Sequence, residues 1–362
     1  MDKQSTEIFN RILNEQSYYP DMERKSITER ETDLLDWYEK YNEVNEFYNV
    51  WGLDLISSED PSIYLDHGIF RKQRYSINST FICTGDEFPT NYTVVMRDKS
   101  LFEMFAANIL GDTTKYVKSY ALIKGNLFLP LGNVGARQET FLQFVEKHNG
   151  EKLVFKRTTG CSGMSVYVTS INEGKIIHRG ISYFPSEFLE KITDMAATWM
   201  IQPFVKQHPF MDTLNSETVN IIRIVTFNTG MHTFTTPATL VYARQGAEVC
   251  NSDQGSYYVG INKNGVIAEK AVDRLESRFV NCPAAGKKLP FFNELIDLVC
   301  ALHTAIPELF TIGWDVALTE SGPLVLEGND GWCPYVNELS ADTALRETWD
   351  KAVLERKNYY GL

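Results

Sequence analysis

Residues 311–329, TIGWDVALTESGPLVLEGN, constrain the fold more than any other stretch of this sequence. Two apolar runs flank a Thr-Glu-Ser-Gly segment, which predicts two antiparallel strands joined by a tight turn. With the turn centred on Ser321, Asp315 lies directly opposite Glu327, and Asn329 points to the same face because side chains alternate along a strand. Two like charges in opposed positions destabilise a sheet. Either both carboxylates face water, or a hard divalent cation, Mg²⁺ above all, binds them through oxygen.

The composition is that of a globular protein, with 43% hydrophobic and 23% charged residues among 362. This length predicts about two or three domains. The net charge of −12 argues against nucleic acid as a partner, because affinity for a phosphate backbone comes largely from Lys and Arg. No apolar run approaches the roughly 18 residues of a membrane helix, residues 1–11 lack a signal-peptide pattern, and the six cysteines lack metal-ligand spacing. We expect a soluble, cytoplasmic protein with reduced thiols and no membrane partner.

The sequence predicts mainly helices before residue 150 and mainly strands after it. The first fifty residues are expected to be helical, with Thr28 to Glu31 as a capping box. Further helices are predicted from Asp98 to a cap at Gly111, over about 137–148, near 186–200 and over 290–305. Large side chains recur every three or four residues after the capping box, and we interpret this stripe as core packing: Leu34, Trp37, Tyr41, Val44, Phe47 and Trp51. The predicted class is mixed α+β with antiparallel hairpins.

A Gly-rich loop lies within VFKRTTGCSGMSVYV, residues 154–168. Lys156 ends one strand, and Thr158 to Gly163 precede the next. Backbone amides of such a loop can approach phosphate oxygens, and the lysine adds a positive charge. The loop lacks the P-loop pattern and leads into a strand, which excludes a P-loop and a Rossmann site. A plain hairpin turn is the alternative.

A third stretch, residues 199–227, contains a strand, a connection and a second strand. Gln202 to Val205 form a connection whose backbone edge could meet a flat heterocycle. Asn220 and Arg223 stand near the start of the second strand. Because Arg223 interrupts the apolar run IIRIV, we expect its guanidinium to meet a carboxylate or a phosphate. A structural salt bridge is the alternative.

These three stretches, taken in order, resemble the ATP-grasp superfamily, and most closely its sugar-transfer-associated branch. The similar text is RDKSLF at 97–102, KRTTGCSGMS at 156–165, IQPFVKQHP at 201–209, VNIIRIVT at 219–226, ARQGAEVCNSDQGSYYVGINKNG at 243–265 and IGWDVALTESGPLVLEGN at 312–329. The resemblance spans roughly residues 60–335. It implies an α+β, ATP-grasp fold in which two α+β subdomains, 96–205 and 206–362, clamp ATP between antiparallel sheets, with a helical region at 1–95.

The resemblance also implies ATP and Mg²⁺ as cofactors. Lys99 and Lys156 would contact the phosphates, and the metal ligands would be Asp315, Glu327 and Asn329. The cofactor-binding residues of the flap would be Thr158, Gly160, Ser162, Gly163 and Ser165, and those near adenine would be Gln202, Phe204 and Val205, with Asn220 as a further ligand. Lys156 and Arg223 would be catalytic, Arg223 by steadying the γ-phosphate or an acyl phosphate.

Four positions depart from the family pattern. Arg157 stands where proline usually follows the lysine, and Gln202 stands where the connection usually begins with glutamate. A glutamate for the ribose is not evident, and Asp212 is the candidate in its place. Gly313 stands where many relatives have arginine, so another arginine would supply that charge: Arg223 or Arg244.

The implied reaction joins a carboxylic acid to an amine through an acyl phosphate, with ADP and phosphate released. The partners would be small molecules, such as an amino acid and an amino sugar in polysaccharide or natural-product biosynthesis. The alternatives are an ATP-grasp phosphotransferase and a nucleotide-binding module without turnover. We interpret Cys161 as a small flap residue rather than a nucleophile, and His208 as structural rather than as a base. The N-terminal helices could form an acceptor wall or a homodimer contact.

Overall fold

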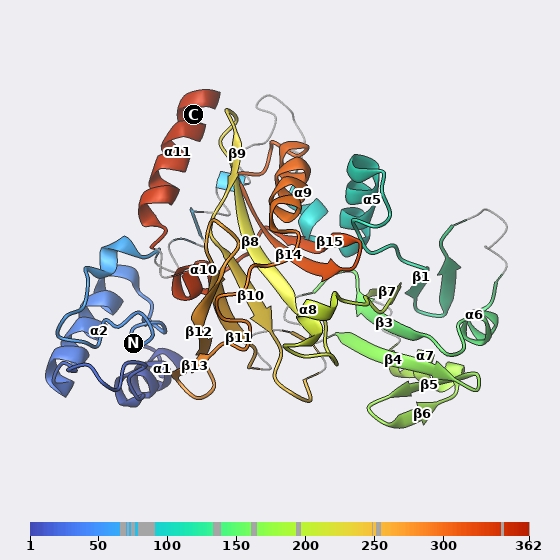
Figure 1. The fold of residues 1–362 in the computed structure, drawn as a ribbon, viewed down its shortest axis with the longest axis horizontal. Helices are drawn as coiled ribbons and strands as arrows, with labels where there is room; N and C mark the ends of the chain where they lie inside the picture. The colour runs from blue at the N-terminus through green and yellow to red at the C-terminus, as the bar shows by residue number, and fades with distance from the viewer. Residues whose placement is uncertain are drawn as a thin grey trace.

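The computed structural model describes all residues except 66–69, 71, 74–76, 79–90, 133–138, 161–164, 193–196, 248, 251–254, 342–343 and 362, and the side chains of 336 and 339–341. Within this part of the chain the strands form two antiparallel sheets (Figure 1). The larger sheet occupies the middle of the molecule, with the N-terminal helices on one side of it and the smaller sheet on the other. The predicted α+β class is confirmed.

The smaller sheet has the strand order β2 (Leu127–Pro130), β1 (Ala121–Lys124), β7 (Thr198–Pro203), β3 (Lys152–Arg157), β4 (Val166–Asn172), β5 (Lys175–His178) and β6 (Ile181–Tyr183). Helices α6 (Phe141–Lys147) and α7 (Pro185–Ile192) share its core, which includes Phe144, Phe155 and Phe188. The helix expected near 186–200 is shorter than predicted, since α7 spans Pro185–Ile192 and β7 already begins at Thr198. Strands β5 and β6 pair as a hairpin, because Arg179 and Gly180 between them adopt left-handed conformations (φ 51° and 72°) that turn the chain.

The larger sheet has the order β13 (Arg278–Asn281), β12 (Ile267–Asp273), β11 (Tyr257–Ile261), β10 (Ala238–Tyr242), β8 (Ile221–Asn228), β14 (Thr311–Thr319) and β15 (Gly322–Asn329), and β9 (Thr233–Thr235) pairs with β8. Helices α5 (Lys99–Leu110) and α9 (Phe292–Thr304) cover one face, in a core that includes Phe102, Leu298 and Trp314. As predicted, α5 begins at an Asp98 cap and ends at Gly111 (φ 62°).

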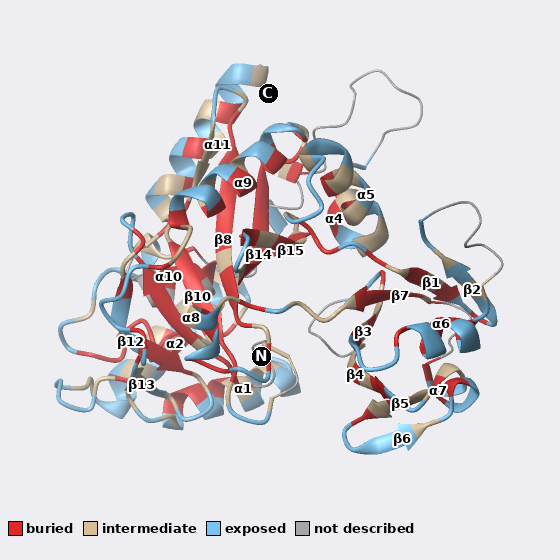
Figure 2. Cartoon of the chain, turned by 45° about the vertical axis from the view of Figure 1, so that its right-hand side comes forward, coloured by how far each residue is buried: buried red, intermediate tan, exposed pale blue. Residues whose placement is uncertain are grey.

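The opposite face of the larger sheet carries two apolar cores with a charged side chain between them. Residues 221, 223, 225 and 227 of β8 share this face, because side chains alternate. Ile221 belongs to a core with the N-terminal region, whereas Val225 and Phe227 belong to a core with α11 (Arg346–Tyr360). Figure 2 shows the central strands as buried along most of their length. Arg223 lies in the interval between these two cores.

The N-terminal region begins with α1 (Lys3–Asn14) and α2 (Ile27–Tyr41). The capping box of α2 consists of Ser26 and Glu29 rather than of residues 28–31: Glu29 N donates to Ser26 Oγ, and Ser26 N donates to Glu29 Oε2. The prediction was wrong because two S/T-x-x-E patterns overlap here and the earlier one starts the helix. The stripe is confirmed as core packing for most of its members. Leu34, Val44, Phe47 and Trp51 are buried with residues of the larger sheet and the half-buried Trp37 packs against them, whereas the half-buried Tyr41 lies outside this core.

Four short helices connect these parts: η1 (Pro61–Ile63), α4 (Val94–Arg97), α8 (Pro209–Asp212) and α10 (Pro334–Ala341). Among the described residues, no helix combines the length and apolar character needed to cross a membrane.

The β14–β15 hairpin pairs as predicted around its two carboxylates, with Asp315 opposite Glu327 and Gly313 opposite Asn329. The turn itself is one residue shorter than expected, because Thr319 lies opposite Gly322. A bulge restores the predicted register by inserting Leu326 as an extra residue on β15. The bulge also brings Leu326 and Glu327, which are adjacent in sequence, to the wall of one cavity.

Candidate active site

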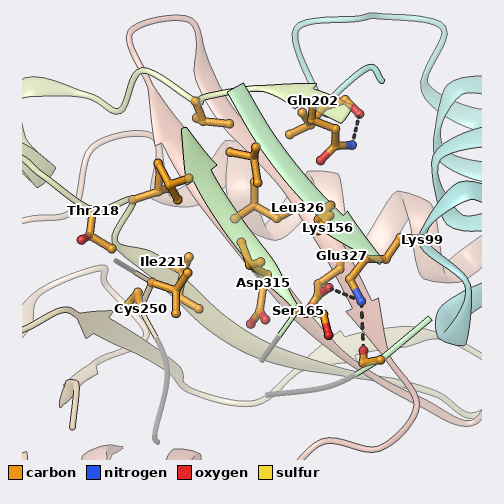
Figure 3. Close-up of a pocket in the computed structure, with 18 of the residues that line it drawn as sticks. Lys99, Lys156, Ser165, Gln202, Thr218, Ile221, Cys250, Asp315, Leu326 and Glu327 are labelled. Atoms are coloured by element: carbon orange, nitrogen blue, oxygen red, sulfur yellow. Dashed lines mark hydrogen bonds and ion pairs between the residues drawn. The ribbon is translucent and has the colours of Figure 1, made fainter. Parts of the chain in front are cut away.

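A cavity of about 410 Å³ lies between the two sheets (Figure 3). Its walls come from β3, β4 and β7 of the smaller sheet and from β8, β14 and β15 of the larger one. Charged side chains gather at one end, and most of the remaining wall is apolar. The predicted site residues that line it are Lys99, Lys156, Gly160, Ser165, Gln202, Phe204, Val205, Arg223, Asp315, Glu327 and Asn329.

Four charged side chains form a row along one wall of the cavity. Arg223 lies opposite Asp315 across β8 and β14, and Asp315 lies opposite Glu327 across β14 and β15. Arg223 Nη2 donates a 2.8 Å hydrogen bond to Asp315 Oδ2, and Lys99 Nζ lies 3.3 Å from Glu327 Oε2. Each carboxylate has a cation beside it, which offsets the repulsion expected from the sequence. Because Asp315 is buried, the alternative in which both carboxylates face water is wrong.

Burial and neighbouring charges shift the pKa values of this row. Burial raises the pKa of Asp315, Arg223 opposes this rise, and the charge of Glu327 adds to it. Burial would also raise the pKa of Glu327, but Lys99, Lys156 and Arg223 together lower it. Burial lowers the pKa of Lys156 to about 8, although Glu327 opposes the change. Three cations therefore face two carboxylates at neutral pH, an arrangement that attracts a polyanion.

The acidic end also offers ligands for a hard cation. Carboxylate and amide oxygens are the donors that Mg²⁺ binds, and Asp315, Glu327 and Asn329 all line the cavity. In the described part of the chain, no cluster of three or more His, Cys, Asp or Glu side chains could hold a metal. A cation bound here would therefore use two carboxylates and the Asn329 amide, which suits Mg²⁺ better than a softer metal.

The predicted phosphate loop is anchored to the start of α5. Lys99 N donates to Thr158 O at 2.8 Å, and Lys99 Nζ donates to Gly160 O at 3.1 Å. Asp98 and Thr159 form an isolated antiparallel bridge. Gly160 and Ser165 line the cavity, whereas Thr158 is buried and contributes backbone bonds. Three predicted loop residues lie outside the described residues: Cys161, Ser162 and Gly163.

The other end of the cavity is largely apolar. Gln202, Phe204 and Val205 line one edge, and Lys152 Nζ lies 5.2 Å from the ring centroid of Phe204. The facing walls contain aliphatic side chains from both sheets, including Val154, Val168 and Leu326. Two aliphatic walls with a polar edge can hold a planar heterocycle.

Four predicted site residues do not line the cavity: Thr158, Asp212, Asn220 and Arg244. Asp212 is exposed and accepts a 2.9 Å hydrogen bond from Gln207. Asn220 is buried and donates to three oxygens, those of the Gln207 side chain and of two main-chain carbonyls. Arg244 donates to Gly255 O and pairs with Asp273. Because these partners already hold the side chains away from the cavity, the geometry does not support their predicted contacts with the cofactor or the substrate.

The position of His208 agrees with the interpretation of this histidine as a structural residue. Its Nδ1 accepts a 3.0 Å hydrogen bond from Phe210 N at the start of α8, which makes it a helix cap. It does not belong to the described cavity lining.

Several cavity residues were missed by the sequence analysis. Leu326 would point away from Glu327 in a regular strand, and only the bulge brings both to the cavity. Cys250 and Tyr258 reach the same wall from the β10–β11 connection and from β11. A local sequence signal for these contacts does not exist, because they depend on which strands become neighbours.

The family of this chain can now be assigned. The family model of sugar-transfer associated ATP-grasp proteins matches residues 87–353, which is more than half of the chain. The chain belongs to this family. The ATP-grasp fold accounts for the cavity between two antiparallel sheets, as the resemblance implied. No curated protein sequence matches the chain.

Solved structures with a similar fold include a D-alanine–D-alanine ligase from Coxiella burnetii, with 9% identity and a TM-score of 0.42 over 74% of this chain and 60% of that one. D-cycloserine synthetase DcsG has 14% identity and a TM-score of 0.40 over 73% of this chain and 71% of that one. An ADP complex of N5-carboxyaminoimidazole ribonucleotide synthetase (purK) has 12% identity and a TM-score of 0.38 over 66% of this chain. The ATP-grasp chain spans 46% of that synthetase, and the likeness concerns the fold alone.

Proposed function

We propose that this ATP-grasp protein is a ligase that joins a carboxylic acid to an amine through an acyl phosphate. The observation that supports this proposal best is the row of Lys99, Glu327, Asp315 and Arg223, with Lys156 in the same cavity. Its cations can neutralise phosphate oxygens, and its carboxylates can bind the Mg²⁺ that accompanies a nucleoside triphosphate.

In this proposal ATP spans the cavity from its apolar end to its charged end. The adenine lies between the aliphatic walls, with its edge toward Gln202 and the backbone of Val205. The triphosphate extends toward Lys99 and Lys156. Asp315, Glu327 and Asn329 would hold Mg²⁺, which neutralises charge on the phosphates.

The first step is a phosphoryl transfer. A carboxylate oxygen of the acid forms a bond to the γ-phosphorus, and the bond between that phosphorus and the bridging oxygen breaks to release ADP. Lys99 and Lys156 hold the phosphate oxygens, and Arg223, which lines the same cavity, stabilises negative charge on the transferred group. The products of this step are ADP and the acyl phosphate.

The second step forms the amide. The amine nitrogen bonds to the carbonyl carbon, the bond from that carbon to the phosphate oxygen breaks, and the amine proton leaves with phosphate or solvent. A protein nucleophile is not needed. Burial raises the pKa of the cavity residue Cys250 to about 12, so its thiol stays protonated and unreactive at neutral pH.

We propose an amino acid and an amino sugar, or another amine, as partners; the family's description as sugar-transfer associated supports this choice. We also propose that residues 96–205 and 206–362 act as the two halves of the clamp, behind the helical region at 1–95. The α5 helix, although it lies within 96–205, packs on the larger sheet and so joins the two halves.

Trapping of the acyl phosphate tests the proposal. The protein is incubated with Mg²⁺-ATP, a pool of carboxylic acids and hydroxylamine, and the products are analysed by mass spectrometry. Hydroxylamine intercepts an acyl phosphate without the natural amine. Acid-dependent ADP together with a hydroxamate is the expected result. ADP with a stable phosphorylated acceptor would instead identify a phosphotransferase, and binding without turnover would identify a nucleotide-binding module.

A further inference from the structure

A hydrogen-bonded chain lies behind the apolar end of the cavity and joins α5 to β7. Ser119 N donates to Glu103 Oε1 at 2.7 Å, and the Ser119 hydroxyl donates to Glu103 Oε2. Gln202 Nε2 donates to Ser119 Oγ and to Val117 O, both at 3.2 Å. Ser119 and Gln202 are 2% and 5% exposed, so water does not compete for these bonds.

The chemistry of the donors and acceptors fixes which group donates in each hydrogen bond between Gln202, Ser119 and Glu103. A carboxylate can only accept, so Glu103 takes the hydrogen of the Ser119 hydroxyl. Ser119 Oγ is then left with lone pairs toward Gln202, and Val117 O is an acceptor as well. Both neighbours therefore require the NH₂ group of the Gln202 carboxamide, because its oxygen would meet two acceptors if the amide were reversed.

As a consequence, a hydrogen-bond acceptor is held in a fixed orientation at the apolar end of the cavity, where we propose that the base binds. With both hydrogens of Nε2 used, the carboxamide oxygen of Gln202 lies away from Val117 and toward the interior of the cavity (Figure 3). We propose that Glu103 and Ser119 are positioning residues, which hold this oxygen ready to accept a hydrogen bond from the exocyclic amino group of a purine. The site then selects a 6-aminopurine over a 6-oxopurine. This inference rests on the proposed use of ATP.

The helix that carries Glu103 also carries Lys99. The two residues are four positions apart on α5, so they lie on one side of the helix. Lys99 belongs to the charged row through its contact with Glu327, and Glu103 reaches the apolar end through Ser119. The α5 helix therefore positions side chains at both the charged end and the apolar end of the cavity.

Direct binding of ADP and IDP tests this inference, because the two nucleotides share ribose and phosphates and differ at position 6 of the base. Dissociation constants are measured by calorimetry with Mg²⁺ for the whole protein and its variants. We expect the unmodified protein to bind ADP at least about tenfold more tightly than IDP. Ser119→Ala should weaken ADP binding by about three- to tenfold and leave IDP binding unchanged. Glu103→Gln, which keeps the side-chain size and replaces one of the two acceptor oxygens with an NH₂ donor, should act in the same direction.

Ser182→Ala is the matched control, because Ser182 is an exposed serine on β6 of the same sheet. It should change neither constant. An equal loss of ADP and IDP binding in Ser119→Ala and Glu103→Gln would show a merely structural role and overturn the inference. Equal affinity of the unmodified protein for ADP and IDP would overturn it while the ligase proposal stands. Binding of neither nucleotide would overturn both.

Discussion

At the scale of single residues, three cations outnumber the two carboxylates of the cavity: Lys99, Lys156 and Arg223 face Asp315 and Glu327. Glu327 stays anionic because Lys99, Lys156 and Arg223 outweigh its burial. Glu327→Gln keeps the size of this side chain but removes its charge and a metal ligand. We expect Mg²⁺-dependent turnover to fall by about 100-fold or more, while thermal unfolding remains a single transition. The rate of ADP release, measured against Mg²⁺ concentration, checks this.

Glu320→Gln is the control, because Glu320 lies in the exposed turn of the same hairpin. It should retain full activity. Equal activity of the Glu327→Gln variant and the unmodified protein would remove Glu327 from the metal site.

Lys156 gives the nucleotide site a dependence on pH. Burial lowers its pKa to about 8, so the free protein carries this positive charge below pH 8 and loses it above. If the ammonium is needed, nucleotide affinity falls by up to about tenfold for each pH unit above 8. Dissociation constants for ADP between pH 6.5 and 9.5 check this. Lys156→Arg should flatten the curve, since arginine stays charged, and Lys156→Met should bind weakly throughout. A curve of the same shape for Lys156→Arg would assign the pH dependence to another group.

At the scale of the elements, β14 has no room for a side chain at Gly313. A Cβ atom on Gly313 would lie 2.5 Å from the Cβ of Trp332, whose side chain is buried against Phe70 and Phe227. Trp332 thus occupies the space that a side chain at 313 would need. Gly313→Ala should lower the free energy of unfolding by about 1–3 kcal/mol, because the strand or Trp332 has to move. Urea unfolding measures this, and an unchanged midpoint would contradict the close contact.

The attachment of α9 to the larger sheet depends on a neutral histidine. His303 Nδ1 lies 2.6 Å from Thr226 Oγ1, and Nε2 lies 3.0 Å from Leu309 O. Burial lowers the pKa of His303 to about 3. Between about pH 6.5 and pH 3, His303 is protonated in the unfolded chain but stays neutral in the folded chain. The contribution of this neutral ring to stability is therefore complete above pH 6.5 and is lost progressively as the pH falls toward 3.

His303→Gln should remove part of this pH dependence. We expect the free energy of unfolding to vary less between pH 6.5 and 4 in this variant, although the variant is less stable at neutral pH. Urea unfolding at several pH values measures it. Parallel curves for the His303→Gln variant and the unmodified protein would contradict the assignment.

At the scale of the whole molecule, the N-terminal region and the larger sheet share one core. Phe47 stacks on Tyr335, with ring centroids 4.3 Å apart, and Arg274 lies over both rings. The same core includes Ile221, Val241 and Tyr258, which also line the cavity. A loss of packing in the N-terminal region should therefore directly disturb the residues that form this wall of the cavity.

Phe47→Ala tests this shared core. We expect it to lower the free energy of unfolding by about 3–5 kcal/mol. Because the core is continuous, circular dichroism and ADP binding should report the same unfolding midpoint. Leu35→Ala, at an exposed position on α2, is the control. Two separate transitions in the Phe47→Ala variant would show that the N-terminal region is an independent unit.

The sequence alone determined the features that depend on local order. Alternating side chains and a tight turn predicted the β14–β15 hairpin and the opposition of Asp315 and Glu327, and cap signals predicted both ends of α5. The order of the lysine loop, the Gln202 connection and the hairpin was enough to indicate the family, because order and spacing are properties of the sequence itself.

Only the tertiary structure decided which side chains meet. Arg244 pairs with Asp273 instead of reaching the cavity, and Gln202 bonds to Val117, 85 residues away. Leu326 faces the cavity because of a bulge that strict alternation does not predict. These outcomes depend on which strands become neighbours and in what register. A period of two fixes the face of a side chain within a strand, but it says nothing about the partner that burial then requires.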